Sequence, residues 1–383
     1  MRNIQYDMIY LAACGVNGSS PEAEFIKELD LEKMYQLSYM HSMEALIGMV
    51  LRQAGVSLSK EWNEKIAKAV RKILLFDAER TKLLSFMEER GIWYLPLKGI
   101  ILKDYYPAIG MRQMSDNDIL FDYSFSDEIQ KYMESQGYKT VSIGKHHHDE
   151  YEKEPVYNFE MHGNLYGEKH IRGWSEYYAD IKKKLILNEG SSYGYHFTEE
   201  DFYVYIVSHI YKHYEEYGTG IRGLLDMYVY LKEMSSKLDY AYIEQECTVL
   251  GITDFEKQNR ELCKKVFGVK TLAQTEALEN ELSAEEKELI RYYFTSGAYG
   301  TLERGVKKRI EKVWNENEDI SRLSYMWSRI FPPKEQMKKH YSQVYKHKLL
   351  LPYAYICRLW EGLHDKKRRE KMFVEVDTIK KMK

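Results

Sequence analysis

Two acidic residues, Asp116 and Asp118, stand two positions apart at the start of the apolar run Ile119 to Phe121. If this run forms a β-strand, alternate side chains project to the same face, so the two carboxylates are neighbours. Like charges about 4 Å apart repel by roughly 4 kcal/mol at an effective dielectric constant of about 20. The pair therefore needs protons, basic partners or metal ions.

A third carboxylate stands on another alternating stretch. In "PVYNFEMH", residues 155–162, the aromatic and apolar positions face one way, whereas Glu160 and His162 face the other. Three carboxylates suit Mg²⁺, which takes one or two protein carboxylates together with water and substrate phosphates. We therefore predict a magnesium site formed by Asp116, Asp118 and Glu160.

A turn upstream could hold a phosphate. The run "IWYLPL", residues 92–97, predicts a short strand, and Gly99 begins a short helix directly after it. Backbone amides of residues 100–103 at the start of that helix are expected to bind an anion, and Lys98 adds a positive charge.

The elements that position these residues follow from the hydrophobic periods. Apolar residues at helical spacing predict helices between Pro21 and Arg90, the last ended by Gly91. Strands are expected at 92–97, 117–122, 138–143 and 155–162, with helices at 100–106 and 127–136. After Tyr195 helices continue nearly to the end of the chain. The expected class is α+β: a helical N-terminal region (1–90), a small mixed-sheet α/β core (91–195) and a large helical C-terminal domain (196–383).

The stretch "LPLKGIILKDYYPAIGMRQMSDNDILFD" resembles the nucleotidyltransferase superfamily, whose signature is a strand, a Gly-containing turn, a helix and Asp-x-Asp. It is most similar to the poorly characterised bacterial nucleotidyltransferase-like family, which continues with the pattern apolar-acid-apolar-His, here "FEMH". The segments "HIYKHYEEYGTGIRGLLDMYVYL", "RIFPPKEQMKKHY" and "LLLPYAYICRLW" extend the resemblance over residues 25 to 360. Two departures are Ile100, where the superfamily usually has Gly or Ser, and Asn117 inside Asp-x-Asp.

This resemblance implies transfer of a nucleoside monophosphate from a nucleoside triphosphate, such as ATP, to a hydroxyl, with release of pyrophosphate. Two Mg²⁺ ions would be bridged by Asp116 and Asp118, and Glu160 would complete the ion that activates the acceptor. The remaining nucleotide-binding candidates are Lys98, Gly99, Arg112, His162, His213 and Arg222.

Several of these residues also have structural interpretations, which the sequence leaves open. Lys98 and Arg112 could neutralise the carboxylates as ion pairs, and Arg222 with Asp226 has the i, i+4 spacing of a helical pair. The run "KHHHDE", residues 145–150, is interpreted as a polar loop near the site, because adjacent strand residues alternate faces. His209 and His213 lack the Glu of a HExxH zinc motif and are expected in the core or near the substrate.

Composition narrows the class of protein. The four cysteines form no CxxC pair, which argues against a disulfide framework and a thiolate zinc site. No run of about 18 apolar residues and no secretory signal is apparent, so we expect a cytoplasmic protein without membrane insertion. The net charge is −3, yet residues 338–383 carry 13 Lys or Arg against 5 Asp or Glu. That basic tail is typical of a solvated helix end, and contact with an acidic partner stays open.

The acceptor is not determined by these patterns: a small molecule, a protein side chain and an RNA end all remain open. Two functions remain open as alternatives to nucleotidyl transfer to an unidentified acceptor. The first is a noncatalytic nucleotide-binding or interaction protein that retains the fold. The second is a toxin-like enzyme that nucleotidylates tRNA or protein.

Overall fold

The structure is a computed structural model and describes residues 2–144, 148–167, 171, 173–316, 327, 331, 353, 355–356, 360, 364, 369 and 373–378. The chain forms two compact units. The first comprises Met1–Lys212 and Thr219–Ala298, and the second comprises His213–Gly218 and Tyr299–Lys383. The expected division at residues 90 and 195 stays a prediction.

The first unit begins with five helices: α1 (Ile4–Asn17), α2 (Ala23–Glu28), α3 (Leu31–Met40), α4 (Glu44–Gln53) and α5 (Lys60–Arg90). The side chain of Ser59 caps α5 by accepting from the amide of Trp62, and Gly91 ends it in the left-handed conformation with φ +73°. The helices predicted between Pro21 and Arg90 are thus confirmed.

A mixed sheet follows. Its strands are β1 (Tyr94–Pro96), β2 (Asn117–Phe121), β3 (Lys139–Ser142), β4 (His148–Lys153) and β5 (Tyr157–His162). Their order is β1-β2-β5-β4-β3, with β2 and β5 parallel and the other pairs antiparallel. Between the strands lie α6 (Gly99–Leu102), η1 (Lys103–Tyr105), η2 (Tyr123–Phe125) and α7 (Ser126–Ser135). The α+β class is therefore confirmed.

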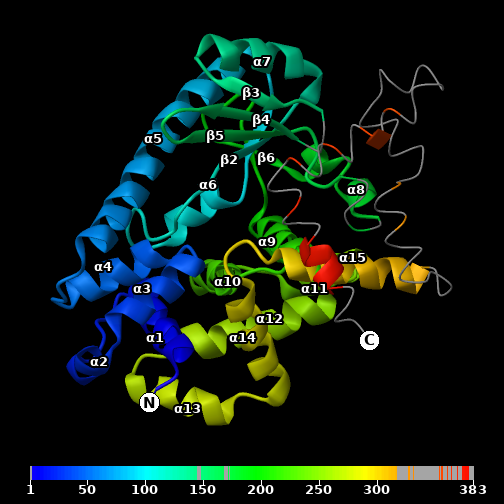
Figure 1. Cartoon of the computed structure of the whole chain (residues 1–383). Helices are drawn as coiled ribbons and strands as arrows, with labels where there is room; N and C mark the ends of the chain where they lie inside the picture. Colours follow the sequence, from blue (N-terminus) through cyan, green and yellow to red (C-terminus); the bar gives the residue numbers. More distant parts are fainter. Residues whose placement is uncertain are drawn as a thin grey trace. The chain divides into compact units, whose positions relative to one another are not determined.

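One face of this sheet is apolar and lies against α5 and α7 (Figure 1). Ile119 and Phe121 of β2 join Phe159 and Met161 of β5 in this core. The helices contribute Ile73, Phe76, Leu83, Met87, Ile129 and Met133. Because strand side chains alternate, this packing directs Asp118 and Glu160 to the opposite face.

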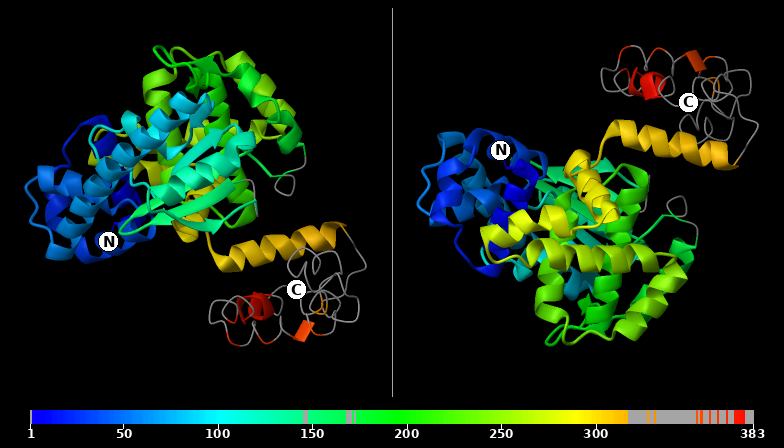
Figure 2. Two further views of the ribbon diagram at one scale, coloured as in Figure 1. Left: turned by 90° about the horizontal axis from the view of Figure 1, so that it is seen from above. Right: turned by 90° about the horizontal axis from the view of Figure 1, so that it is seen from below.

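The remaining elements of the first unit are mostly helical. They are α8 (Trp174–Tyr177), η3 (Ile181–Lys184), β6 (Ile186–Leu187), β7 (Tyr195–His196), α10 (Ile221–Met234), α11 (Tyr240–Leu250), α12 (Thr253–Phe267), α13 (Leu272–Glu281) and α14 (Ala284–Ser296). Helix α9 (Glu199–Glu216) starts in the first unit and ends in the second. Figure 2, seen from below, shows α12 to α14 on the side of the unit away from α7.

The second unit contains α15 (Leu302–Glu316), on which Lys308 pairs with Glu215 at 3.1 Å. Most of the basic tail, including all but Arg369 of the run at 366–371, lies outside the described residues. Across the described part of the chain, every helix is too short or too polar to cross a membrane. Cys14, Cys247 and Cys263 are buried free thiols.

Candidate active site

The polar face of the sheet brings the acidic residues together. Asp118 of β2 and Glu160 of β5 are direct register partners on adjacent parallel strands, and Asp116 immediately precedes β2. Asn117 faces the other way, where its Oδ1 accepts from Arg80 of α5 at 3.0 Å. The departure at Asn117 therefore leaves the carboxylate face undisturbed.

Asp118 is held by two donors. Its Oδ1 lies 2.6 Å from Lys98 Nζ and 2.8 Å from His162 Nε2, and its side chain is only 4% exposed. Burial would raise the pKa of Asp118, but the charge of Lys98 and the His162 hydrogen bond hold that pKa well below its ordinary value. Burial likewise opposes a charged Lys98, yet Asp118, Asp116 and Glu160 together raise its pKa. The expected ion-pair interpretation of Lys98 is thus seen in the structure.

Asp116 is in the opposite situation. Burial, then the charges of Asp118 and Glu160, raise the pKa of Asp116 to about 7. The Ser115 hydroxyl donates to Asp116 Oδ2 at 2.8 Å, which offsets this only in part. Asp116, Asp118 and Glu160 are therefore close enough to repel one another. The positive charge of Lys98 does not bring the pKa of Asp116 back to its ordinary value.

The Lys98–Gly99 turn differs from the expectation. Lys98 adopts φ +46°, a left-handed conformation that costs energy outside glycine. However, the amides of Ile100, Ile101 and Leu102 donate to the carbonyls of Leu97 and Lys98 at 2.9 to 3.1 Å. The prediction that these amides are available to a phosphate is wrong, because α6 is so short that its first amides bond to the carbonyls of the turn between β1 and α6.

Glycine is required at position 99 for a reason other than the approach of a phosphate. A Cβ atom there would lie 2.4 Å from Arg112 Nη1, so only glycine lets that guanidinium approach. Arg112 in turn donates through Nε and Nη2 to both oxygens of Asp226 on α10, at 2.9 and 3.0 Å. Tyr106 donates to Asp226 Oδ1 at 2.8 Å.

The Arg112–Asp226 pair connects the turn to α10. From sequence, Arg112 was considered a partner of the strand carboxylates instead, and the pairing of Arg222 with Asp226 stays a prediction. Arg222 lies one turn before Asp226 on α10, and its charge partly opposes the rise that burial and Asp226 cause in the pKa of Tyr106. Recognition of nucleotide by Arg112 or Arg222 stays a prediction.

His148 is a site residue that the sequence analysis missed. The predicted polar loop is replaced at this point by β4, in which His148 pairs in register with His162. His148 Nε2 lies 3.9 Å and His162 Nε2 3.6 Å from Glu160 Oε2, and the two rings are 5.0 Å apart. Burial, then the His162 charge, lower the pKa of His148 to about 4. Every residue from 145 to 150 is polar, so no alternation in the sequence marked His148 as a strand residue.

Helix α9 packs near the polar face of the sheet. Tyr205 of α9 is buried. Burial, and next to it the charge of Asp118, raises the pKa of Tyr205 well above its ordinary value. Ser208 of α9 bonds Tyr166 at 2.7 Å and Tyr178 at 3.1 Å, both in the segment after β5. His213 belongs to the second unit, and residues 145–147 lie outside the described part.

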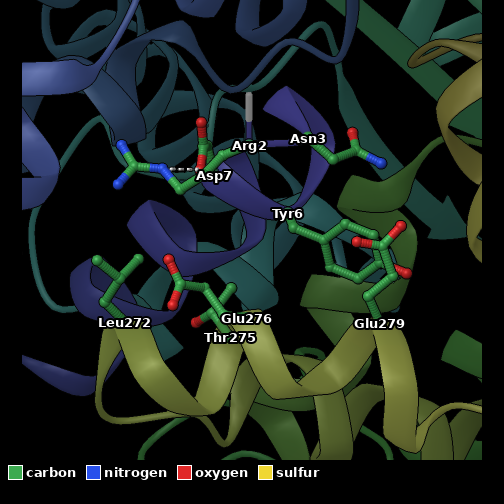
Figure 3. A pocket seen from close by; sticks show the side chains of 8 residues that line it. All are labelled: Arg2, Asn3, Tyr6, Asp7, Leu272, Thr275, Glu276 and Glu279. Atoms are coloured by element: carbon green, nitrogen blue, oxygen red, sulfur yellow. Dashed lines mark ion pairs between the residues drawn. The ribbon is translucent and has the colours of Figure 1, made fainter.

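A separate small cavity of about 90 Å³ lies between the start of α1 and α13 (Figure 3). Arg2, Tyr6 and Asp7 line one side, and Thr275, Glu276 and Glu279 line the other. Arg2 is paired with Asp7 at 3.3 Å. This cavity lies far from β2 and β5 (Figure 1), so it does not belong to the carboxylate site.

A mixed sheet with clustered carboxylates beside a Lys-Gly turn defines a protein of the nucleotidyltransferase type. The chain belongs to the family described as uncharacterised nucleotidyltransferase, whose model matches residues 27–268. The resemblance stated for 25–360 is thereby confirmed up to residue 268. No curated protein and no solved structure matches this chain.

Proposed function

We propose that this protein is a metal-dependent nucleotidyltransferase that moves a nucleoside monophosphate from a nucleoside triphosphate to an acceptor hydroxyl. In that reaction the acceptor oxygen bonds to the α-phosphorus, the bond to the β-phosphate oxygen breaks, and pyrophosphate leaves. The observation that carries the proposal is the convergence of Asp116, Asp118 and Glu160 on one sheet face. Family membership supports the general reaction class.

The donor set fits divalent cations. Burial, and then the charges of Asp118 and Glu160, raise the pKa of Asp116, so a cation that replaced its proton would relieve the repulsion among the three carboxylates. Asp116 and Asp118 would hold Mg²⁺, and Glu160 would complete the second position. When bound, the ions would lower the pKa of the acceptor hydroxyl and neutralise the triphosphate oxygens.

The chain's own residues then have distinct tasks. Glu160, 21% exposed at its side chain, is the candidate base for the acceptor proton. Lys98 would release Asp118 when cations bind and would then contact a phosphate oxygen, supplying fixed positive charge. Arg112, held by Asp226, keeps the Gly99 turn in place for Lys98.

The proposal is tested by incubating the full chain with a lysate, each nucleoside triphosphate and Mg²⁺, and by identifying acceptors through mass spectrometry. We expect a mass gain of one nucleoside monophosphate on an acceptor, and no gain with Asp116→Ala. Nucleotide binding without any transfer would favour the noncatalytic alternative. A mass gain confined to tRNA would identify the toxin-like activity as the particular form of the transfer.

A further inference from the structure

Two imidazoles, those of His148 and His162, lie next to Glu160. This side of the site therefore offers nitrogen as well as oxygen ligands. His148, Glu160 and His162 each offer one ligand atom, and these atoms all lie within 4.8 Å of one another. They come from the adjacent strands β4 and β5, whose register places His148 opposite His162. Because both strands are paired along their length, the sheet backbone sets these positions.

The spacings suit a single shared ion. Two ligand atoms that each lie about 2.1 Å from an ion are about 3.0 Å apart when the ligand–ion–ligand angle is about 90°, as in an octahedral site. They are about 3.6 Å apart when that angle is about 120°, as in a trigonal site. Glu160 Oε2 lies 3.6 Å from His162 Nε2 and 3.9 Å from His148 Nε2, and the three ligand atoms all lie within 4.8 Å of one another, so the two imidazoles must turn toward each other to share an ion. The His162 side chain is 2% exposed, and those of His148 and Glu160 are about one fifth exposed, which leaves the group accessible.

Ligand chemistry then decides which ion is preferred. Mg²⁺ takes oxygen ligands and is poorly served by imidazole, whereas first-row transition-metal ions bind imidazole well. A set of two imidazoles and one carboxylate is a facial arrangement that such ions occupy with further coordination positions open. Asp116 and Asp118 offer only oxygens, so the two sides of the site differ in kind.

We propose that His148, Glu160 and His162 form a binding position for a divalent first-row transition-metal ion, distinct in its preference from the Mg²⁺ position at Asp116 and Asp118. On binding, the His162 Nε2 proton moves to Nδ1, so that Nε2 ligates the ion instead of donating to Asp118. The inference deepens the proposed function by naming the ion beside Glu160. Binding itself requires neither nucleotide nor transfer.

The test is equilibrium dialysis of the chelator-treated full chain against CoCl₂ and, separately, MnCl₂, in a large excess of MgCl₂ and without nucleotide. We expect about one Co²⁺ per chain to be retained, with a visible absorption spectrum typical of nitrogen and oxygen ligands, because imidazole selects against Mg²⁺. His148→Ala and His148→Gln are expected to weaken Co²⁺ binding by about 10- to 100-fold. His196→Ala is the matched control, since it removes an exposed imidazole on β7 and is expected to bind Co²⁺ as the unchanged chain does.

The inference is overturned if Co²⁺ is not retained over Mg²⁺, or if His148→Ala and His148→Gln bind it as tightly as the unchanged chain. It is also overturned if His196→Ala loses as much affinity as the His148 variants. Asp116→Asn separates the two proposals, because it should retain Co²⁺ while transfer is lost. Transfer with Mg²⁺ but without Co²⁺ retention would support the proposed function and overturn the transition-metal position. Co²⁺ retention without transfer would support the transition-metal position and contradict the proposed function.

Discussion

The two residues of the Asp-x-Asp pattern have opposite energetic roles in the folded chain. Asp118 is stabilised by Lys98 and His162, whereas Asp116 faces two other carboxylates with little compensation. From sequence alone the pair was treated as equivalent, because period 2 fixes the shared face but not the partners. The partners of Asp118 come from a turn 20 residues earlier and a strand 44 residues later.

This difference predicts different effects of single substitutions on the metal-free chain. Asp118→Asn leaves the partly buried Lys98 ammonium without its buried carboxylate partner and should lower the free energy of unfolding by about 3 kcal/mol. Asp116→Asn removes repulsion and should leave it unchanged or raise it by about 1 kcal/mol. Urea denaturation in the presence of a chelator measures both. Equal losses in the two variants would contradict this account.

The residues that sequence reasoning missed share a physical reason. His148 stands in a run of three histidines, where the alternation of a strand is hidden because every position is polar. Arg112 and Asp226 are 114 residues apart, so their pairing depends on packing that no local spacing reveals. Glu160 was found because its neighbours Phe159 and Met161 are apolar.

At the scale of elements, the turn between β1 and α6 is the most constrained part of the site. Its amides are used within the turn, and Lys98 holds a positive φ. The anion-binding helix start expected from sequence failed because four residues of helix leave few amides beyond the closing turns. Phosphate contact by the Lys98 side chain at this turn stays a prediction.

Gly99→Ala is expected to disturb this element. The new Cβ would lie 2.4 Å from Arg112 Nη1, and that guanidinium is fixed by Asp226, so we expect a loss of about 1 to 3 kcal/mol in the free energy of unfolding. Gly223→Ala on α10 is the control, because its Cβ meets nothing closer than 3.3 Å and alanine favours helix. Thermal and urea unfolding of both variants would measure the effect. A loss as large in Gly223→Ala would count against the Arg112 contact as its cause.

At the scale of the first unit, the helices before and after the sheet pack together. Helix α1 is buried along most of its length, Asn17 donates to the Phe267 carbonyl at 2.8 Å, and Lys232 donates to the Val16 carbonyl at 2.7 Å. Sequence periods predicted helices in both regions but not this contact between them. Pairings across more than 200 residues leave no local signal.

The packing of these helices also buries His41, which directly follows α3, completely. Its ring meets Phe294 of α14 at 5.2 Å. Burial lowers the pKa of His41 to about 4; the nearby Phe294 backbone opposes this shift, and the charge of Arg222 adds to it. The unfolded chain therefore binds a proton at His41 more readily than the folded chain.

Stability should consequently fall as the pH falls from about 6.5 towards about 4. Between pH 8 and pH 5 we expect His41 to account for about 2 kcal/mol of this loss. Comparing urea unfolding of the unchanged chain and His41→Gln at both pH values isolates this term, because only the first contains the titrating imidazole. Parallel pH dependences for the two chains would disprove it.

Asp116, which immediately precedes β2, together with Asp118 on β2 and Glu160 on β5, is proposed to support transfer of a nucleoside monophosphate. The most direct measurement uses the full chain with Mg²⁺, a lysate fraction containing the acceptor, and nucleoside triphosphates labelled at either the α- or the γ-phosphate. We expect the α-label on the acceptor, the γ-label in pyrophosphate, and neither product with Asp116→Asn. Transfer of the γ-label to the acceptor, or α-label transfer that survives in Asp116→Asn, would contradict the account.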